Sequence, residues 1–198
     1  VLMQEDCRAE NGIVAIPPGI KQGANRRFAG EDVVPGARIL AAGTRLRPQE
    51  IGLAASIGRI SLPVYKPVRV ALFSTGDEVR DTGTDLPPGC IYDANRYSVA
   101  AALEQLGCAV DDLGILPDSY QIISDTLANA AYRHDLIMTS GGVSTGEEDH
   151  VRAAIEALGK MHFWRLAIRP GRPLALGQLD SVPFIGPPGN PVPVPVPY

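Results

Sequence analysis

The stretch "DLIMTSGGVSTGEEDHVRAAIEALG" (residues 135–159) decides the fold, because it holds one complete unit of strand, loop and helix. Its first six residues form a mostly apolar run that predicts a buried strand. Val151, Ala154, Ile155 and Leu158 recur at helical spacing, and Gly159 is a suitable helix stop. A strand that leads through a short loop into a helix is the building unit of a parallel sheet.

The same alternation continues on both sides of this stretch. Apolar runs predict strands at 68–74, 108–116, 162–168, 172–177 and 182–186. Helical spacing predicts helices over 95–107 and 119–132, with Ile123, Leu127, Ala130 and Ala131 on one face of the second. We therefore expect an α/β fold, with a mostly parallel sheet and helices on both faces.

Residues 1 to about 66 differ in composition, because glycine and proline interrupt short apolar runs at 12–20, 37–46 and 57–65. These runs predict short strands, so this part of the chain is a β-rich module. One helix is expected over 47–58, with Pro48 in its first turn and Gly58 as its stop.

Composition excludes several classes of protein. The 198 residues are 45% hydrophobic and 20% charged with a net charge of −4, which is ordinary for a globular protein. No apolar run is long enough to cross a bilayer, and no basic stripe suggests nucleic acid. Cys7, Cys90 and Cys108 are scattered, which argues against a disulfide framework or a zinc site and fits a reducing cytosol.

Acidic residues and glycines follow several of the predicted strands. Glu78, Asp118 and Asp149 each lie in a loop after a strand, and Ser140-Gly141-Gly142 forms a turn with little side-chain bulk. Because ligands of such sheets bind beyond the carboxyl ends of the strands, these loops predict one site. Bare backbone amides suit phosphate, and neighbouring carboxylates need a cation such as Mg²⁺ between them.

Each of these residues also has a structural interpretation. Asp118 and Asp149 precede predicted helices and can cap them, and Gln121 completes a capping pattern for Asp118. Asn95 can cap the helix at 95–107, with Asp93 as a turn former. The arginines of "FWRLAIRPGRP" are either solvated charges or a cationic patch for oxyanions; they are Arg165, Arg169 and Arg172.

Several motifs in fixed order resemble the MoeA-type molybdenum insertases, the relatives of the gephyrin E-domain. They are "RRFAGEDVVPGARILAAGTRL", "VRVALFSTGDEV", "GCIYDANRYSVAAALEQLG", "SGGVSTGEEDHVRAAIEALG", "FWRLAIRPGRPLALG" and "PPGNP". The resemblance implies a MogA/MoaB-like α/β domain at 67–198, a dimerisation and linker segment at 37–66, and the end of a β-rich module at 1–36.

The resemblance also implies a reaction: molybdate is inserted into adenylylated molybdopterin, with Mg²⁺-dependent release of AMP. Glu78, Asp118 and Asp149 are then catalytic and metal-binding, and Asp32 adds a further acid, from across a dimer interface. The implied substrate-binding residues are Thr75, Gly76, Asp93, Asn95, Ser140, Gly141, Gly142, Arg165, Arg169, Pro170, Gly189 and Asn190.

Alternatives to the insertase remain open at this point. A molybdopterin adenylyltransferase would use the same sheet and glycine turn, and a gephyrin-like scaffold would bind partners without catalysis. The implied partners of an insertase are the pterin substrate, molybdate, a second copy of the chain, a molybdopterin adenylyltransferase and molybdoenzyme chaperones. The resemblance also implies further segments before and after this chain, and the prolines of "PVPVPVPY" predict an extended path where the family has a helix.

Overall fold

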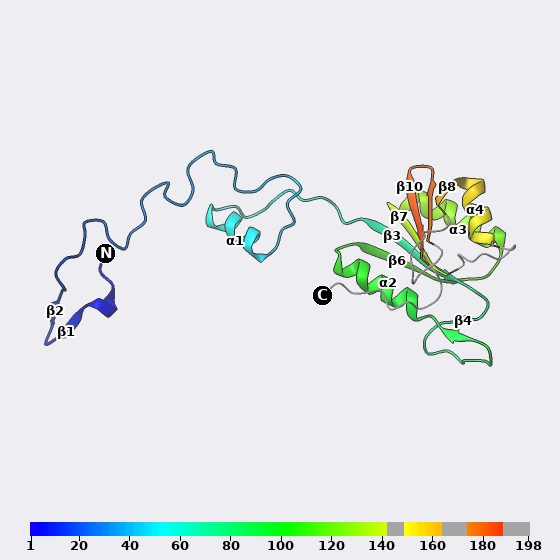
Figure 1. Ribbon diagram of the computed structural model, residues 1–198, viewed down its shortest axis with the longest axis horizontal. Coiled ribbons are helices and arrows are strands. Elements are labelled where there is room, and N and C mark those ends of the chain that lie inside the picture. Colours follow the sequence, from blue (N-terminus) through cyan, green and yellow to red (C-terminus); the bar gives the residue numbers. More distant parts are fainter. Residues whose placement is uncertain (142–148, 164–173, 188–198) are drawn as a thin grey trace. The chain divides into compact units, whose positions relative to one another are not determined.

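The computed structural model describes residues 1–141, 149–163 and 174–187. Contacts divide the chain into two compact units, Val1–Val64 and Tyr65–Tyr198, and each is described by itself (Figure 1). Among the described residues, no helix combines the length and hydrophobicity needed to cross a membrane.

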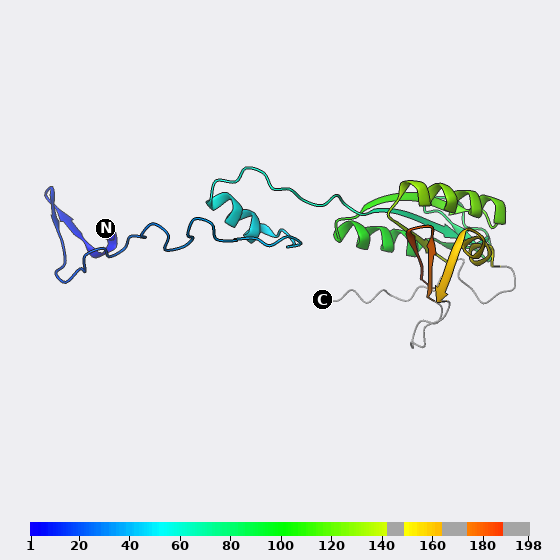
Figure 2. The same cartoon turned by 90° about the horizontal axis from the view of Figure 1, so that it is seen from above.

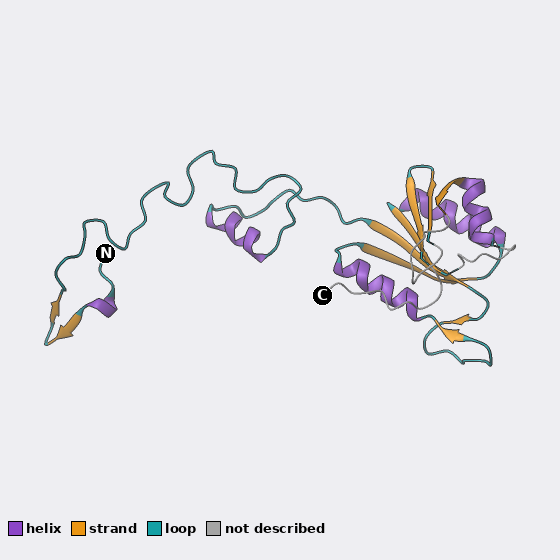
Figure 3. Cartoon of the chain, viewed as in Figure 1, coloured by secondary structure: helices purple, strands orange, loops and turns teal. Residues whose placement is uncertain are grey.

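The second unit is built on a six-stranded sheet, whose strands are orange in Figure 3. The strand order is β6-β3-β7-β10-β9-β8. Neighbouring strands are parallel from β6 to β10, whereas β9 runs antiparallel to both β10 and β8. The strands are β3 (Arg69–Thr75), β6 (Ala109–Leu116), β7 (Leu136–Ser140), β8 (Gly159–Phe163), β9 (Ala175–Leu179) and β10 (Val182–Gly186).

Helices cover both faces of this sheet, as the sequence predicts. Helix α2 (Ala94–Gln105) and helix α3 (Tyr120–Arg133) lie on opposite faces (Figure 2). Helix α4 (His150–Leu158) packs beside α3 and shares its hydrophobic core. The α/β class with a mostly parallel sheet is therefore confirmed.

The core forms because β3 is buried on both faces. Val70, Leu72 and Phe73 are fully buried, and Phe73 joins the core under α3 and α4. From α3, the predicted face contributes Ile123 and Leu127, both fully buried, together with Ala130. Parallel strands between two helical layers read as continuous apolar runs, which is why the sequence identified them.

Two predicted strands are displaced in the last part of the sheet: the strand predicted at 172–177 is β9, Ala175–Leu179, and the strand predicted at 162–168 is β8. Gly159 ends α4 but is also the first residue of β8, so the strand begins three residues earlier than the predicted 162. A Cβ at Gly159 would lie 2.0 Å from the carbonyl oxygen of Gln178, so β8 can approach β9 there because this residue is glycine. Residues 164–168 of the predicted strand lie outside the described residues.

The first unit contains less regular structure than the sequence suggests. Strands β1 (Arg8–Glu10) and β2 (Ile13–Ala15) form an antiparallel pair after a short 3-10 helix, Gln4–Asp6. The apolar runs at 37–46 and 57–65 are not strands, so that prediction is wrong. A strand needs a neighbour for its backbone groups, and these runs have none within the described unit.

The predicted helix of the first unit is present as α1 (Pro48–Ser56). Pro48 occupies its first turn, and the Glu50 side chain accepts from the backbone N–H of Arg47 at 2.9 Å. The helix ends at a Schellman motif, in which the N–H of Gly58 bonds to Ala55 and that of Arg59 to Ala54. Gly58 has a φ of +79°, so the sequence placed the stop correctly.

Candidate active site

The carboxyl ends of three parallel strands lie side by side. Thr75 at the end of β3 pairs with Leu116 at the end of β6, and Ser74 pairs with Ser140 at the end of β7. Each helix returns from this edge to the start of the next parallel strand, so α2, α3 and α4 all begin here. Topology thus brings Glu78, Asp118 and Asp149 to the same end of the sheet.

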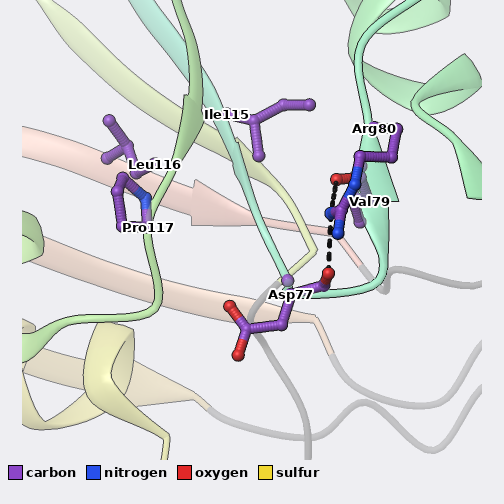
Figure 4. Close-up of a pocket in the computed structure, with 7 residues that line it drawn as sticks. Asp77, Val79, Arg80, Ile115, Leu116 and Pro117 are labelled. Carbon is purple, nitrogen blue, oxygen red and sulfur yellow. Dashed lines mark hydrogen bonds between the residues drawn. The ribbon is translucent and has the colours of Figure 1, made fainter. Parts of the chain in front are cut away.

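An open pocket of about 300 Å³ lies at the ends of β3 and β6. The loop after β3 supplies Asp77 and Arg80, and the end of β6 supplies Pro117 on the other side (Figure 4). The Asp77 carboxylate points away from Arg80, whose guanidinium donates to the backbone oxygens of Asp77 and Val79 at 2.7 and 2.8 Å. The complete lining is Gly76, Asp77, Val79, Arg80, Ile115, Leu116 and Pro117.

Glu78 lies in the tight turn that follows β3. The N–H of Val79 donates to the carbonyl of Gly76 at 3.0 Å, which closes this turn. The Glu78 side chain folds back, and its Oε2 would lie 2.9 Å from a Cβ at Gly76, whose φ is +137°. The positive φ favours glycine at position 76, so no Cβ covers the backbone there at this strand end.

Gly141 lets the ends of β7 and β3 approach each other. Its φ is +109°, and a Cβ would lie 3.1 Å from the carbonyl oxygen of Thr75. The Thr139 hydroxyl donates to the Gly141 carbonyl at 3.0 Å, which fixes the turn. Ser140 is also buried, so the described part of the predicted glycine turn lies beside β3.

Two buried hydroxyls at the end of β3 have no hydrogen-bond partner among the described residues. They are Ser74 Oγ, fully buried, and Thr75 Oγ1, in a residue that is 3% exposed. Buried hydroxyls without partners are rare, because burial costs about 1–3 kcal/mol for each unsatisfied polar group. Such groups are suited to accept or donate when a polar ligand fills the strand end.

Asp118 does not cap α3, so the structural interpretation made for it is wrong. The cap position is Ser119, whose side chain makes no capping bond, and Gln121 instead donates to Asp125 at 3.0 Å. Asp118 is exposed, directly after the pocket residue Pro117. Helix capping therefore does not compete with ligand binding at Asp118.

Asp149 does cap its helix. Its side chain accepts from the backbone N–H of Arg152 at 2.9 Å, at the start of α4. This bond holds the Asp149 carboxylate at the start of α4.

The cap of α2 is Asp93 and not Asn95, so the cap predicted for Asn95 is wrong. Asp93 caps α2 by accepting from the N–H of Arg96 at 3.1 Å, whereas Asn95 lies inside the first turn. Asp93 is 4% exposed and also forms an ion pair with Arg96 at 2.8 Å. It is therefore a buried structural carboxylate at the edge of the candidate site.

Arg96 is a residue of this region that the sequence reasoning missed. It is 2% exposed and donates to Asp93, Asp81 and Asp112. Burial opposes its charge, but the bonds with Asp112 and Asp93 outweigh burial and raise the pKa of Arg96 above its ordinary value. Hydrogen bonding from Tyr97 is the main reason that the pKa of Asp81 lies below its usual range.

No group of three or more His, Cys, Asp or Glu within the described ranges is arranged to hold a metal ion. Mg²⁺ in phosphate chemistry commonly takes one or two carboxylates and completes its shell with substrate oxygens and water. The exposed carboxylates of Glu78 and Asp118 fit that pattern, because they provide oxygen ligands without a complete protein cage.

Asp32 belongs to the first unit, where it forms an exposed ion pair with Arg27 at 2.8 Å. Its predicted part in the site therefore stays a prediction. Several predicted binding residues lie outside the described residues; these are Gly142, Arg165, Arg169, Pro170, Gly189 and Asn190.

Comparison with known proteins identifies the family of this part of the chain. The family model described as "probable molybdopterin binding domain" matches residues 71–196, which include the whole strand-end region. The chain belongs to this family. A second model, the MoeA N-terminal region (domain I and II), matches residues 1–58, so the order of the two parts is that of MoeA proteins.

Curated relatives match nearly the whole chain. A molybdopterin molybdenumtransferase of Haemophilus influenzae is 42% identical over 193 residues, which is 97% of this chain and 48% of the relative. A protein of the same description from a Nostoc species is 36% identical, covering 98% of this chain and 45% of the relative. The chain thus spans about half the length of the curated relatives it matches.

A solved structure supports the family assignment. The molybdopterin biosynthesis MoeA protein of Pyrococcus horikoshii matches with a TM-score of 0.75 and 29% identity, over 96% of this chain and 48% of that one.

Proposed function

We propose that this chain takes part in the insertion of molybdate into adenylylated molybdopterin, with release of AMP. The observation that carries the proposal is the order of its two matching regions, a MoeA N-terminal region before a molybdopterin-binding domain. An adenylyltransferase would need only the molybdopterin-binding domain. The MoeA N-terminal region that precedes this domain therefore favours the insertase. The proposed site is the strand-end edge around the pocket beside β3 and β6.

The residues of this edge suit a substrate that contains a phosphoanhydride. Gly76 and Gly141 bring side-chain-free backbone to the strand ends, and the hydroxyls of Ser74 and Thr75 lack partners among the described residues. Such groups bind and orient phosphate oxygens. Thr75, Gly76, Ser140 and Gly141 are accordingly proposed to hold the substrate.

Glu78, Asp118 and Asp149 are proposed to act as acids of the site and as Mg²⁺ ligands. Bound there, Mg²⁺ would supply charge neutralisation at the pyrophosphate. Glu78 and Asp118 are exposed and can turn toward a substrate, whereas Asp149 is anchored by its cap bond to α4. We further propose that Asp32 of the first unit is an additional acid of the site. Arg165 and Arg169 are proposed to attract molybdate, and the protein is proposed to act as a homodimer.

The direct test is an assay of AMP release from adenylylated molybdopterin, with and without molybdate and Mg²⁺. The proposal expects release that depends on both ions. Formation of adenylylated molybdopterin from molybdopterin and ATP would instead assign the chain to the preceding step. Binding to a partner protein with no effect of Asp118→Asn on cofactor synthesis would identify a scaffold.

A further inference from the structure

The segment from Gly76 to Asp93 connects β3 to α2 and carries Glu78. Its two short strands, β4 (Val79–Arg80) and β5 (Ile91–Tyr92), pair with each other and not with the six-stranded sheet. The position of this connecting segment at the carboxyl ends of the strands therefore depends on where β3 ends and α2 begins, and on side-chain contacts.

The connecting segment is internally tied through its backbone. The N–H of Ile91 donates to the carbonyl of Glu78 at 2.9 Å, and the N–H of Asp93 donates to that of Arg80 at 3.0 Å. A shift of β5 therefore moves the turn that carries Glu78. A contact that holds β5 and the start of α2 in place therefore also holds the Glu78 carboxylate in place.

Arg96 makes that connection. One buried guanidinium donates to Asp81 of the connecting segment at 2.8 Å, to the cap residue Asp93 at 2.8 Å, and to Asp112 of β6. Asp112 is part of the sheet, so the three bonds tie the connecting segment and α2 to the strand that ends at the pocket. Tyr97 adds a bond from its hydroxyl to Asp81 at 2.8 Å.

We propose that Arg96 is a positioning residue that holds the connecting segment, and with it Glu78, at the end of β6. The planar fork of arginine can reach three carboxylates in fixed directions, which a lysine ammonium on its flexible stem cannot do. Loss of Arg96 leaves three neighbouring carboxylates without a cation, and their repulsion opens the segment. The catalytic consequence rests on the proposed function, whereas the structural one does not.

The test combines amide hydrogen exchange with the AMP-release assay on the whole protein. Arg96→Gln and Arg96→Lys should speed exchange at the Ile91 and Asp93 amides by at least about tenfold, since a lost ion pair opens the segment locally. Amides of β7 should keep their exchange rates. The kcat for AMP release should fall while KM changes little, because Glu78 is displaced.

A matched control is Arg69→Gln, which breaks an ion pair with Asp135 at the opposite end of β3. It should leave the Ile91 and Asp93 amides and kcat unchanged. If Arg96→Gln does not fold, Asp112→Asn removes the tie to the sheet alone and should give the same local effect, reduced in size.

Two outcomes would overturn the proposal. One is a uniform rise in exchange across the sheet in the Arg96 variants, which would mark a general stabilising role. The other is unchanged exchange at Ile91 and Asp93 despite lost activity. Faster local exchange in a protein whose parent releases no AMP would confirm the positioning role and reject the proposed function.

Discussion

At the scale of the residue, the contact between Gly141 and the Thr75 carbonyl sets how closely β7 and β3 approach at the site. Gly141→Ala places a methyl group 3.1 Å from that oxygen at a φ of +109°. We expect a loss of stability of about 1–3 kcal/mol, because both the conformation and the contact are unfavourable for alanine. Urea unfolding measures this loss.

The control is Gly107→Ala. Gly107 also has a positive φ, +87°, but a Cβ there would meet no atom within 4 Å. Its loss should be smaller than that of Gly141→Ala. Equal losses would show that the contact with Thr75 contributes nothing.

Asp118 provides the clearest test of a single carboxylate. It is exposed and has no capping role, so Asp118→Asn should change the free energy of unfolding by less than about 0.5 kcal/mol. Molybdate-dependent AMP release should fall by roughly 10²-fold, as for loss of a catalytic acid or base. Asp125→Asn, on the exposed face of α3, is the control and should keep full activity. Wild-type rates in Asp118→Asn would remove Asp118 from the proposed site.

Sequence alone identified which residues stand near the site but not all of their local roles. Asp149 was correctly expected to be able to cap a helix, whereas Asp118 and Asn95 were assigned caps that belong to Ser119 and Asp93. Neighbouring polar residues can each cap, and backbone dihedrals decide between them. Arg96 had a usable signal, because a cation in the first turn of a helix opposes the helix dipole and needs acidic partners.

At the scale of the element, an ion pair joins the starts of β3 and β7. Asp135 accepts from the backbone N–H of Arg69 at 2.9 Å and from its guanidinium at 2.9 and 3.0 Å. The Arg69 guanidinium is the main cause that holds the pKa of Asp135 well below its usual range. A carboxylate of this kind stabilises the fold above its unfolded-state pKa, about 3.9, and loses that effect as the pH falls below it.

Asp135→Asn should therefore lower the urea midpoint at neutral pH, and the difference from the parent should shrink as the pH falls below about 4. Paired urea titrations of the parent and the variant across this range provide the measurement. A difference of constant size at all pH values would show that the charge of Asp135 is not what stabilises the strand pair.

The elements of the second unit were predictable because buried parallel strands and amphipathic helices leave strong patterns. The face of α3 with Ile123 and Leu127 was correct, as were β3, β6, β7 and β10 within about one residue. The strands predicted for the apolar runs at 37–46 and 57–65 were wrong, because apolar composition alone does not supply a neighbouring strand. The β4–β5 pair was missed, since two residues in each strand are too few for a period.

At the scale of the whole molecule, the main hydrophobic core lies within the second unit. Its members come from 71–184, whereas Ala54 is the only hydrophobic residue of the first unit in the buried set. We expect a protein of residues 65–198 to unfold cooperatively, with a midpoint within a few degrees of that of the 198-residue chain. Circular dichroism on both proteins tests this. A broad, non-cooperative transition of the shorter protein would show that its core needs residues 1–64.

Strand β6 is an edge strand of the described sheet, which has a consequence for aggregation. Exposed Asp111 and Asp112 stand along this outermost strand, next to Gly114 with its φ of +77°. Negative charge on an open border discourages a strand from another molecule from adding to it, and so guards against amyloid-like growth. Asp112 would thus have two roles. Its carboxylate binds Arg96, and its charge discourages strands of other molecules from pairing with β6.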